Sequence, residues 1–506
     1  GKGTVTNMGA EIGATTSTFG YDGQMDPYLR STNRALIADL CKKYAPHLQS
    51  DPEVEADPEK FYDEFHEIDL DQLEPHIVGP HTPDLGRPIS SMASEVDEKG
   101  YPEELSSALI GSCTNSSYED MSRSVSLVRQ AKAAGIKVKS NFLVTPGSEK
   151  IYETIKQDGI LSEFEEAGAK VLANACGPCI GQWKREDKKK GEANSILTSY
   201  NRNFAKRNDG NPETLGFISS PELVVAMAFA GSMKFNPLTD SLKDKDGNDF
   251  KFDPPSGDVL PSNGYSSKDS GYEEPTKTGE VVINPSSERL AFLNPFPKQD
   301  PIEDYKDLPL LLKAQGKCTT DHISQAGPWL KFRGHLDNIS NNMFLGATNS
   351  FTGGTGTGNN PVTGEKDIEI NKIARSLKDD GFGWIAVGDE NIGEGSSREH
   401  AAMEPRHMGG RAFIAKSYAR IFEANLKKQG LLPLTFGNKD DFEKIQEKDR
   451  ITISGLDTLT QGETLTVHIN HDDGSTDEII VEHSLNEQEI QWFNHGSALN
   501  YVGSQK

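Results

Sequence analysis

The sequence has no long uninterrupted apolar run. A membrane-spanning helix needs about 18 or more consecutive apolar residues, and no stretch of the 506 residues approaches that length. The hydrophobic fraction of 34% is still enough to build buried cores in soluble domains. We therefore expect a soluble globular chain, and its length predicts about three or four domains of roughly 150 residues each.

The sequence is also short of positive charge. Lys and Arg number 53 against 77 Asp and Glu, a formal net charge of −24 that disfavours binding to nucleic acid or to an anionic membrane. Any anionic ligand must therefore be held by a local cluster of cations. In residues 51–74 eleven acidic residues accompany one lysine. This composition predicts a solvated insertion with short amphipathic helices and no catalytic role.

Cysteines are few and odd in number: Cys41, Cys113, Cys176, Cys179 and Cys318. Five cysteines in a long chain disfavour a secreted disulfide framework and favour metal or thiol chemistry. The chain begins at Gly1 without an initiator Met, a basic-then-apolar signal or an Arg- and Ser-rich transit pattern. We expect its N-terminus to be processed or incomplete, and we identify no targeting segment.

Strand-like and helix-like patterns alternate in the first half of the chain. Short apolar runs predict strands at 108–110, 141–144, 170–173 and 195–200. Apolar residues at helical spacing lie between these runs, so we expect right-handed crossovers and a mostly parallel sheet covered on both faces. Residues 237–290 lose this periodicity and are rich in Asp, Lys, Gly, Ser and Pro, which is typical of a linker.

A second α/β region follows the linker. Its predicted strands are 384–387 and 412–415, its predicted helices are 397–408 and 418–428, and a hairpin is expected at 464–482. The Thr- and Gly-rich stretch 351–365 predicts an exposed loop.

Three of the cysteines follow predicted strands of one sheet. Cys113 follows the run at 108–110, and Cys176 and Cys179 follow the run at 170–173. The carboxyl ends of parallel strands meet at one edge of a sheet, so the three thiols should gather there. Three thiolates can bind three irons of a cubane cluster and leave the fourth iron open as a Lewis acid. The residues alone leave three alternatives: zinc with three cysteines and a water, a redox dithiol at Cys-Gly-Pro-Cys, and thiols without a ligand.

Two further loops contain residues suited to an anionic substrate. Arg202, Lys206 and Arg207 follow the strand at 195–200, where the planar guanidinium groups could clamp carboxylates, although a solvated basic turn has the same composition. The loop 393–400 combines glycines with Ser396, placed to act as a base near backbone N–H donors. That loop could equally bind phosphate or merely cap a helix. Asp321-His322 and Arg333 are weaker candidates for site residues.

Five segments together resemble the aconitase family of iron–sulfur hydro-lyases. They occur in the order in which the family has them, at 7–16, 111–121, 175–183, 200–204 and 395–400. The resemblance implies doubly wound, mostly parallel sheets in two aconitase-type core domains, plus a linked C-terminal α/β swivel domain. It divides the chain into a remainder of the second core domain with the acidic insertion (1–74), a third core domain carrying the cysteines (75–267), a linker (268–290) and the swivel domain (291–506).

The resemblance also implies roles for individual residues. Cys113, Cys176 and Cys179 would ligate a [4Fe-4S] cluster with one iron lacking a protein ligand, and Asn201 would lie near it. Substrate carboxylates would be held by Arg202, Arg207, Arg333, Ser397 and Arg398. Ser396 would be the catalytic base, and Glu11 and Asp321 would belong to the hydrogen-bonding network at the substrate hydroxyl.

The implied activity is the interconversion of citrate and isocitrate through cis-aconitate, in the mitochondrial matrix. The motif at residue 7 belongs to the second domain of the family, so the first domain and its acid residues are absent and we expect this chain alone to be inactive or nearly so. A partner chain could supply or replace that domain; otherwise we expect a monomer without membrane contact. The alternatives are a homoaconitase-like hydro-lyase, RNA binding as in a cytosolic relative that has lost its cluster, and a structural or assembly role.

Overall fold

A computed structural model describes residues 1–11, 14, 16–268, 273–276, 278–396 and 398–505 of the chain. The residues form two compact units, one from 1–9 and 16–277 and one from 10–15 and 278–506. The change of unit between 277 and 278 falls inside the predicted linker, and the finer division near residue 74 stays a prediction. In the described part, no helix is both long enough and apolar enough to cross a membrane.

The first unit contains a seven-stranded sheet in the order β2-β1-β7-β6-β3-β4-β5. Its strands are β1 (His76–Val78), β2 (Gly86–Pro88), β3 (Leu105–Gly111), β4 (Asn141–Thr145), β5 (Lys170–Val171), β6 (Asn194–Thr198) and β7 (Thr214–Ile218). The five strands from β7 to β5 are mutually parallel, and β1 and β2 extend one edge in the antiparallel sense. The strands predicted from apolar runs are therefore confirmed, together with the mostly parallel sheet.

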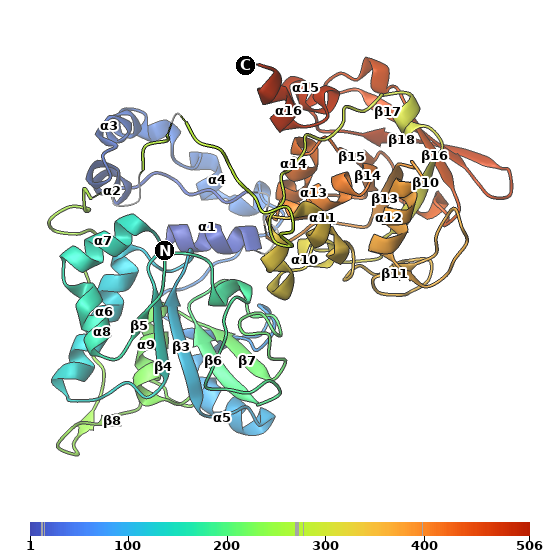
Figure 1. The fold of residues 1–506 in the computed structure, drawn as a ribbon. Coiled ribbons are helices and arrows are strands. Elements are labelled where there is room, and N and C mark those ends of the chain that lie inside the picture. The colour runs from blue at the N-terminus through green and yellow to red at the C-terminus, as the bar shows by residue number, and fades with distance from the viewer. Residues whose placement is uncertain (12–13, 15, 269–272, 277, 397, 506) are drawn as a thin grey trace. The chain divides into compact units, whose positions relative to one another are not determined.

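Helices pack on one face of this sheet, as Figure 1 shows beside β3 and β4. They are α5 (Ile89–Lys99), α6 (Tyr118–Ala133), α7 (Glu149–Gln157), α8 (Ile160–Glu166) and α9 (Pro221–Ala230). Successive strand residues point to opposite faces: Ala108 and Ile110 enter the main core with these helices, whereas Leu109 joins a small cluster with Leu143 and Tyr200. Cys179 and Trp183 pack against that small cluster, so the second face is partly covered by the cysteine loop.

Residues 1–74 are helical where the structure describes them. The helices are α1 (Lys2–Glu11), α2 (Met25–Ser31), α3 (Ala35–Lys43) and α4 (Pro52–Ala56), with short 3-10 turns at 45–47 and 58–60. The described part of this stretch contains no strand, so the sheet expected for a second core domain is not found in it. Apolar residues here follow helical rather than alternating spacing, and prolines interrupt the acidic part. The acidic stretch is largely exposed and contains only short helices, as predicted.

The second unit is built on a closed seven-stranded barrel, β10-β13-β14-β15-β18-β17-β16. Its strands are β10 (Leu308–Lys313), β13 (Trp384–Gly388), β14 (Gly410–Ala415), β15 (Leu432–Phe436), β16 (Arg450–Ser454), β17 (Thr464–Asn470) and β18 (Thr476–Glu482). The first four are mutually parallel and the last three are antiparallel, so the predicted strands and the C-terminal hairpin are confirmed.

The helices of the second unit lie around the barrel (Figure 1). They are α10 (Thr320–Ile323), α11 (Leu336–Ile339), α12 (Ile370–Asp379), α13 (His400–His407), α14 (Arg420–Lys428), α15 (Glu487–His495) and α16 (Ala498–Ser504). Two short antiparallel strand pairs complete the secondary structure: β8 (Leu242–Lys243) with β9 (Asp249–Phe250) in the first unit, and β11 (Thr357–Gly358) with β12 (Ile368–Glu369) in the second. The predicted exposed loop 351–365 therefore contains a strand, and Asn360 in it is buried because its side-chain oxygen accepts the N–H groups of Val362 and Thr363.

Candidate active site

Three loops meet at the carboxyl edge of the parallel strands in the first unit. The loop after β3 carries Cys113, the segment after β5 carries Cys176 and Cys179, and the loop after β6 carries residues 201–207. β3 pairs with both β4 and β6, so two of these loops start from adjacent strands. The topology predicted from the sequence accordingly places all of these residues on one edge.

A sharp turn positions Cys113. Gly111 has a φ of 104° and Ser112 a φ of 66°, both in the left-handed region. A Cβ at Gly111 would lie 1.9 Å from the carbonyl oxygen of Thr145 on β4, so only glycine fits there. The N–H of Ser112 donates to that same carbonyl at 3.0 Å, and the N–H of Gly111 donates to Ser199 Oγ at 3.0 Å. The exposed Cys113 is thus held on a backbone fixed to both neighbouring strands.

Cys176 and Cys179 flank a short 3-10 turn, Pro178–Ile180. The amide of the buried Asn208 donates to the Pro178 carbonyl at 3.1 Å and so ties the turn to the loop after β6. Cys176 is exposed and Cys179 is half-buried, so both thiols remain within reach of a ligand.

Electrostatics place the three thiols in one neighbourhood. Cys176 is exposed as a residue, but partial desolvation raises the pKa of its thiol. The nearby thiols of Cys179 and Cys113 raise this pKa further, Cys179 also through a hydrogen bond. The Arg207 guanidinium acts in the opposite direction and lowers this pKa. The four side chains that the sequence assigned to one edge therefore interact with one another.

Asn7 on α1 links two of these loops. Its amide lies 3.9 Å from Cys113 Sγ, and its carbonyl oxygen accepts from Thr114 Oγ1 at 3.1 Å and from Asn201 Nδ2 at 3.0 Å. Asn201 is thereby placed in the same neighbourhood as Cys113. Asn7 itself received no role from the sequence, although it opens the first of the five family-like segments.

Arg202 is buried and Arg207 half-buried on the loop after β6. The adjacent Asn203 donates to the Thr82 carbonyl at 3.1 Å, which fixes the base of the loop. Arg202 and Arg207 thus lie on one loop, and the charge of Arg207 acts on the Cys176 thiol. This loop supplies the local positive charge that an acidic chain needs to bind an anion.

The second unit contains its own group of predicted site residues, on a loop between β13 and α13. Gly393 has a φ of 80°, and a Cβ there would lie 2.2 Å from the Phe422 ring. Its N–H donates to the Cys318 carbonyl at 2.7 Å, and the Thr320 N–H donates to the Glu394 carbonyl at 3.0 Å. The loops that follow β10 and β13 are therefore bonded directly to each other.

This pair of loops brings Ser396, Asp321 and Arg398 into one region. Arg398 Nη1 lies 2.7 Å from Asp321 Oδ1, and the Arg398 N–H donates to the Ser396 carbonyl at 2.7 Å. Ser396 Oγ is buried and has no hydrogen-bond partner among the described residues. A hydroxyl in that state remains available to a ligand.

Arg333 is connected to the same loop through its backbone. His400 Nε2 lies 2.9 Å from the Arg333 carbonyl oxygen, while the Arg333 side chain is exposed at the end of a 3-10 turn. Two sequence-predicted positions lie outside the described part of the structure: Ser397, and the side chain of Glu11, the last residue of α1.

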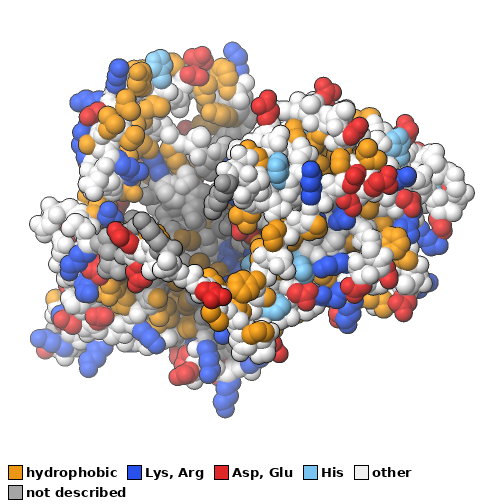
Figure 2. Space-filling view, turned by 45° about the horizontal axis from the view of Figure 1, so that its top comes forward, with side chains coloured by type: hydrophobic (Ala, Val, Ile, Leu, Met, Phe, Trp, Pro, Cys, Tyr) orange, Lys and Arg blue, Asp and Glu red, His pale blue; other side chains and the backbone are white. Residues whose placement is uncertain are grey.

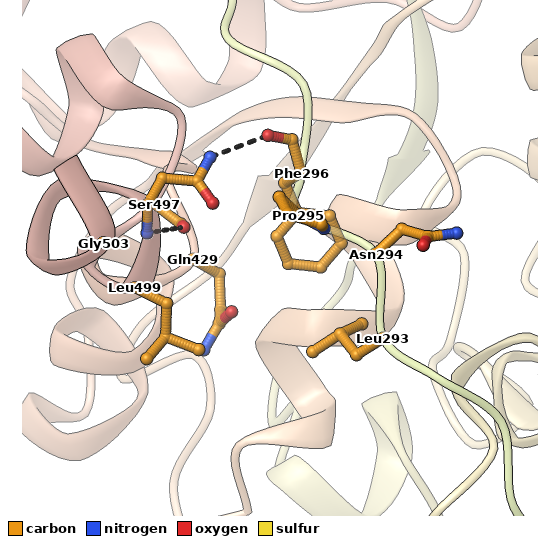
Figure 3. A pocket seen from close by; sticks show the side chains of 9 residues that line it. Leu293, Asn294, Pro295, Phe296, Gln429, Ser497, Leu499 and Gly503 are labelled. Atoms are coloured by element: carbon orange, nitrogen blue, oxygen red, sulfur yellow. Dashed lines mark hydrogen bonds between the residues drawn. The ribbon is translucent and has the colours of Figure 1, made fainter. Parts of the chain in front are cut away.

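Single-ion sites and cavities add no further candidate. Within the described ranges, His, Cys, Asp and Glu side chains form no group of three or more arranged to hold one metal ion. A cubane cluster does not require such a group, since each thiolate binds a different iron. A pocket of about 370 Å³ lies in the second unit, between residues 293–296 and α16. The Asn500 side chain, which lines this pocket, donates to the Phe296 carbonyl at 2.8 Å. None of the predicted site residues is among the side chains that line the pocket, which Figure 3 shows.

Comparison with known proteins matches this chain to one family. The sequence model of the aconitase family (aconitate hydratase) matches residues 1–231, and the model of the aconitase C-terminal domain matches residues 308–439. The mitochondrial aconitate hydratase of Gracilaria gracilis is 55% identical over 505 residues, covering 99% of this chain and 64% of the relative. The chain belongs to the aconitase family.

Other aconitases are similarly close and similarly longer. The mitochondrial aconitate hydratase of Saccharomyces cerevisiae is 54% identical over 99% of this chain and 64% of its own length, and a probable one of Dictyostelium discoideum is 54% identical over 100% and 65%. This aconitase-family chain therefore spans just under two thirds of the relatives that it matches. A solved 3-isopropylmalate dehydratase from Methanocaldococcus jannaschii matches 40% of this chain and 94% of its own at 22% identity, with a TM-score of 0.26, too low to indicate a shared fold.

Proposed function

We propose that the chain is the larger part of an aconitase-type hydro-lyase that interconverts citrate and isocitrate through cis-aconitate. The observation that carries the proposal is the single neighbourhood of Cys113, Cys176, Cys179 and Arg207 in a chain more than half identical to aconitate hydratases. The arginines on the adjoining loops suit a small trianion. The names of the relatives support a mitochondrial location, which we propose to be the matrix.

The donor set fits a [4Fe-4S] cluster. Thiolates are the preferred ligands of iron–sulfur clusters, and three of them leave one iron without a protein ligand. Cys113, Cys176 and Cys179 would hold the cluster, with Asn7 and Asn201 beside them. When bound, it supplies a Lewis acid for the hydroxyl and one carboxylate of the substrate.

The remaining steps are assigned to side chains of this protein. Arg202 and Arg207 in the first unit, and Arg333, Ser397 and Arg398 in the second, would bind the substrate carboxylates. Ser396, ionised to an alkoxide that backbone N–H donors of its loop would stabilise, would take the proton from the carbon beside the departing hydroxyl and so become the neutral hydroxyl again. Its Oγ atom has no hydrogen-bond partner in the described part of the chain. Asp321, which pairs with Arg398, and Glu11 would belong to the hydrogen-bonding network at the substrate hydroxyl.

Exposed apolar surface in residues 19–73 supports the proposal that this activity needs a further protein surface. Between residues 19 and 73 the large exposed hydrophobic residues are Phe19, Tyr28, Leu36, Ile37, Leu40, Tyr44, Leu48, Phe61, Tyr62, Phe65, Ile68, Leu70 and Leu73. Figure 2 shows hydrophobic side chains gathered at the upper left, over α2 and α3. A soluble protein seldom exposes so much apolar surface unless another protein surface covers it. We infer that this surface packs on the part that the longer relatives have in addition, or on a partner chain that replaces it, and that the chain alone is inactive.

Spectroscopy with citrate tests the cluster assignment. The anaerobically purified and reconstituted chain should show visible iron–sulfur absorbance and an EPR spectrum that shifts when citrate is added. Cys113→Ser should abolish this behaviour, whereas Cys318→Ser, which alters a buried thiol of the second unit, should preserve it. Bound zinc without iron–sulfur absorbance would overturn the assignment. Isocitrate formation by this chain alone, at the rate of the longer relatives, would overturn the requirement for a missing part.

A further inference from the structure

A buried carboxyl group lies behind the Arg398 loop. Glu404 on α13 has no exposed surface, and its Oε2 atom has no hydrogen-bond partner within the described part of the chain. Burial raises the pKa of Glu404 well above its usual range, against the opposing effects of the Ser324 hydroxyl and the Arg398 charge. Burial therefore favours the neutral form of this carboxyl group over the ionised form. A buried polar group that is only half satisfied is costly, so its presence calls for a physical reason.

Glu404 is joined to Arg398 through one residue. The buried Ser324 donates from its hydroxyl to Glu404 Oε1 at 2.8 Å, and its backbone carbonyl accepts from Arg398 Nη1. Ser324 follows α10 directly, and its N–H donates to the Thr320 carbonyl at 2.9 Å. The Ser324 peptide is consequently held at its N–H, its side chain and its carbonyl, with the last contact made by the guanidinium.

The burial of Glu404 also bears on the charge available at Arg398, because it favours the neutral form of the carboxyl group. Asp321, at 2.7 Å, is the one carboxylate that pairs with Arg398 among the described residues. An ionised Glu404 would add a second anion behind the guanidinium and draw it inward. In its neutral form, Glu404 would accept the Ser324 hydrogen bond without placing a second negative charge near the arginine.

We propose that Glu404 is a positioning residue that fixes Ser324 and, through the Ser324 carbonyl, the guanidinium of Arg398. The proposal rests on the proposed function only for the role of Arg398 as a ligand of a substrate carboxylate. The contact chain from Glu404 to Arg398 stands without it.

The test measures the motion of the Arg398 guanidinium in the whole chain, without substrate or cluster. In the ¹⁵N-arginine-labelled protein, an immobilised guanidinium gives resolved Nη signals, and Arg398→Lys identifies them by their loss. Glu404→Gln keeps an acceptor for Ser324 and should retain the wild-type signals. Glu404→Leu keeps the volume but loses the acceptor, so rotation about the Nε–Cζ bond should become about fivefold faster, the effect of one ordinary hydrogen bond.

Two smaller changes keep the test decisive if Glu404→Leu does not fold. Ser324→Ala removes only the connecting hydroxyl and should accelerate the rotation similarly. Thr320→Val is the matched control, since Thr320 Oγ1 is buried in α10, next to Ser324, but has no hydrogen-bond partner among the described residues. This change should leave the rotation rate unchanged. In the Glu404→Leu/Ser324→Ala double variant the effects should not add, because both changes break the same path.

The proposal is overturned if rotation stays at the wild-type rate in both Glu404→Leu and Ser324→Ala, or if Glu404→Gln rotates as fast as Glu404→Leu. A purely structural role would lower the melting temperature of Glu404→Leu without this selective change at Arg398. Because the measurement needs neither activity nor cluster, failure of the proposed function and failure of this inference are distinguishable.

Discussion

Replacing Gly111 by alanine should strongly destabilise the first unit. An L-residue in the left-handed region costs about 1–2 kcal/mol, and the new Cβ would lie 1.9 Å from the Thr145 carbonyl oxygen, which belongs to backbone and cannot rotate away. Moving that carbonyl also weakens its 3.0 Å hydrogen bond from Ser112, worth about 0.5–1.5 kcal/mol. With an overpacking cost of about 1–3 kcal/mol, the free energy of unfolding should fall by about 3–6 kcal/mol.

Gly159→Ala provides a matched control in the same unit. Gly159 precedes α8 with a φ of 76°, and a Cβ there would meet no atom within 4 Å. This change should cost only the conformational term of about 1–2 kcal/mol. The difference between the two variants therefore isolates the contact with Thr145.

Native-state hydrogen exchange in increasing urea measures both variants without assuming that the whole chain unfolds in one step. The amides of β3 and β4 should lose about 2–4 kcal/mol more protection in Gly111→Ala than in Gly159→Ala. The Cys113 loop should shift with them, so Gly111→Ala should also take up less iron–sulfur cluster. A difference below about 1 kcal/mol would refute the claim that this close approach fixes the turn before Cys113.

Three further changes test other parts of the structure. Burial opposes ionisation of Asp337, but hydrogen bonds from His407 and Arg375 outweigh burial and lower the pKa of Asp337 to about 2. The resulting stabilisation is present above the unfolded-state pKa near 4 and is lost as the pH falls towards 2. In urea titrations, Asp337→Asn should therefore lower the free energy of unfolding by roughly 1 kcal/mol at pH 7, a value discounted for partial exposure, and by little at pH 2. Burial raises the pKa of the Cys318 thiol to about 12, so this thiol should react slowly in the native chain without a cluster. A thiol reagent should modify the exposed Cys113 and Cys176 and spare Cys318 until urea is added, as mass spectrometry can show. Early labelling of Cys318 would contradict its burial. When the chain is joined to the missing part of a longer relative, Ser396→Ala should keep the cluster spectrum and lose isomerisation, and normal turnover would rule out Ser396 as the base.

The parallel sheet could be predicted because its strands are buried on both faces. Buried strands are continuous apolar runs, such as 108–110 and 141–144, and such runs need no long-range information to be recognised. The edge on which Cys113 and Cys176 meet then follows from strand direction alone. The five family-like segments supplied the remaining assignments.

Closure of the barrel could not be predicted in this way. It depends on β10 pairing with β16, about 140 residues further along the chain, and no local pattern encodes that pairing. The burial of Asn360 was also not predicted, because the Thr- and Gly-rich composition around it gives no sign of the hydrogen bonds that satisfy its side chain. Glu404 gave no signal either, since a helical glutamate in sequence is usually solvated.

The link that Asn7 makes has a consequence for the order of folding. Its partners Cys113 and Asn201 lie 106 and 194 residues away along the chain. Such long loops close slowly compared with the formation of a helix such as α6, so the sheet and its helices should form before α1 docks. The cysteine site would then be among the last features to assemble, and uptake of the cluster would report that a newly made chain has finished folding.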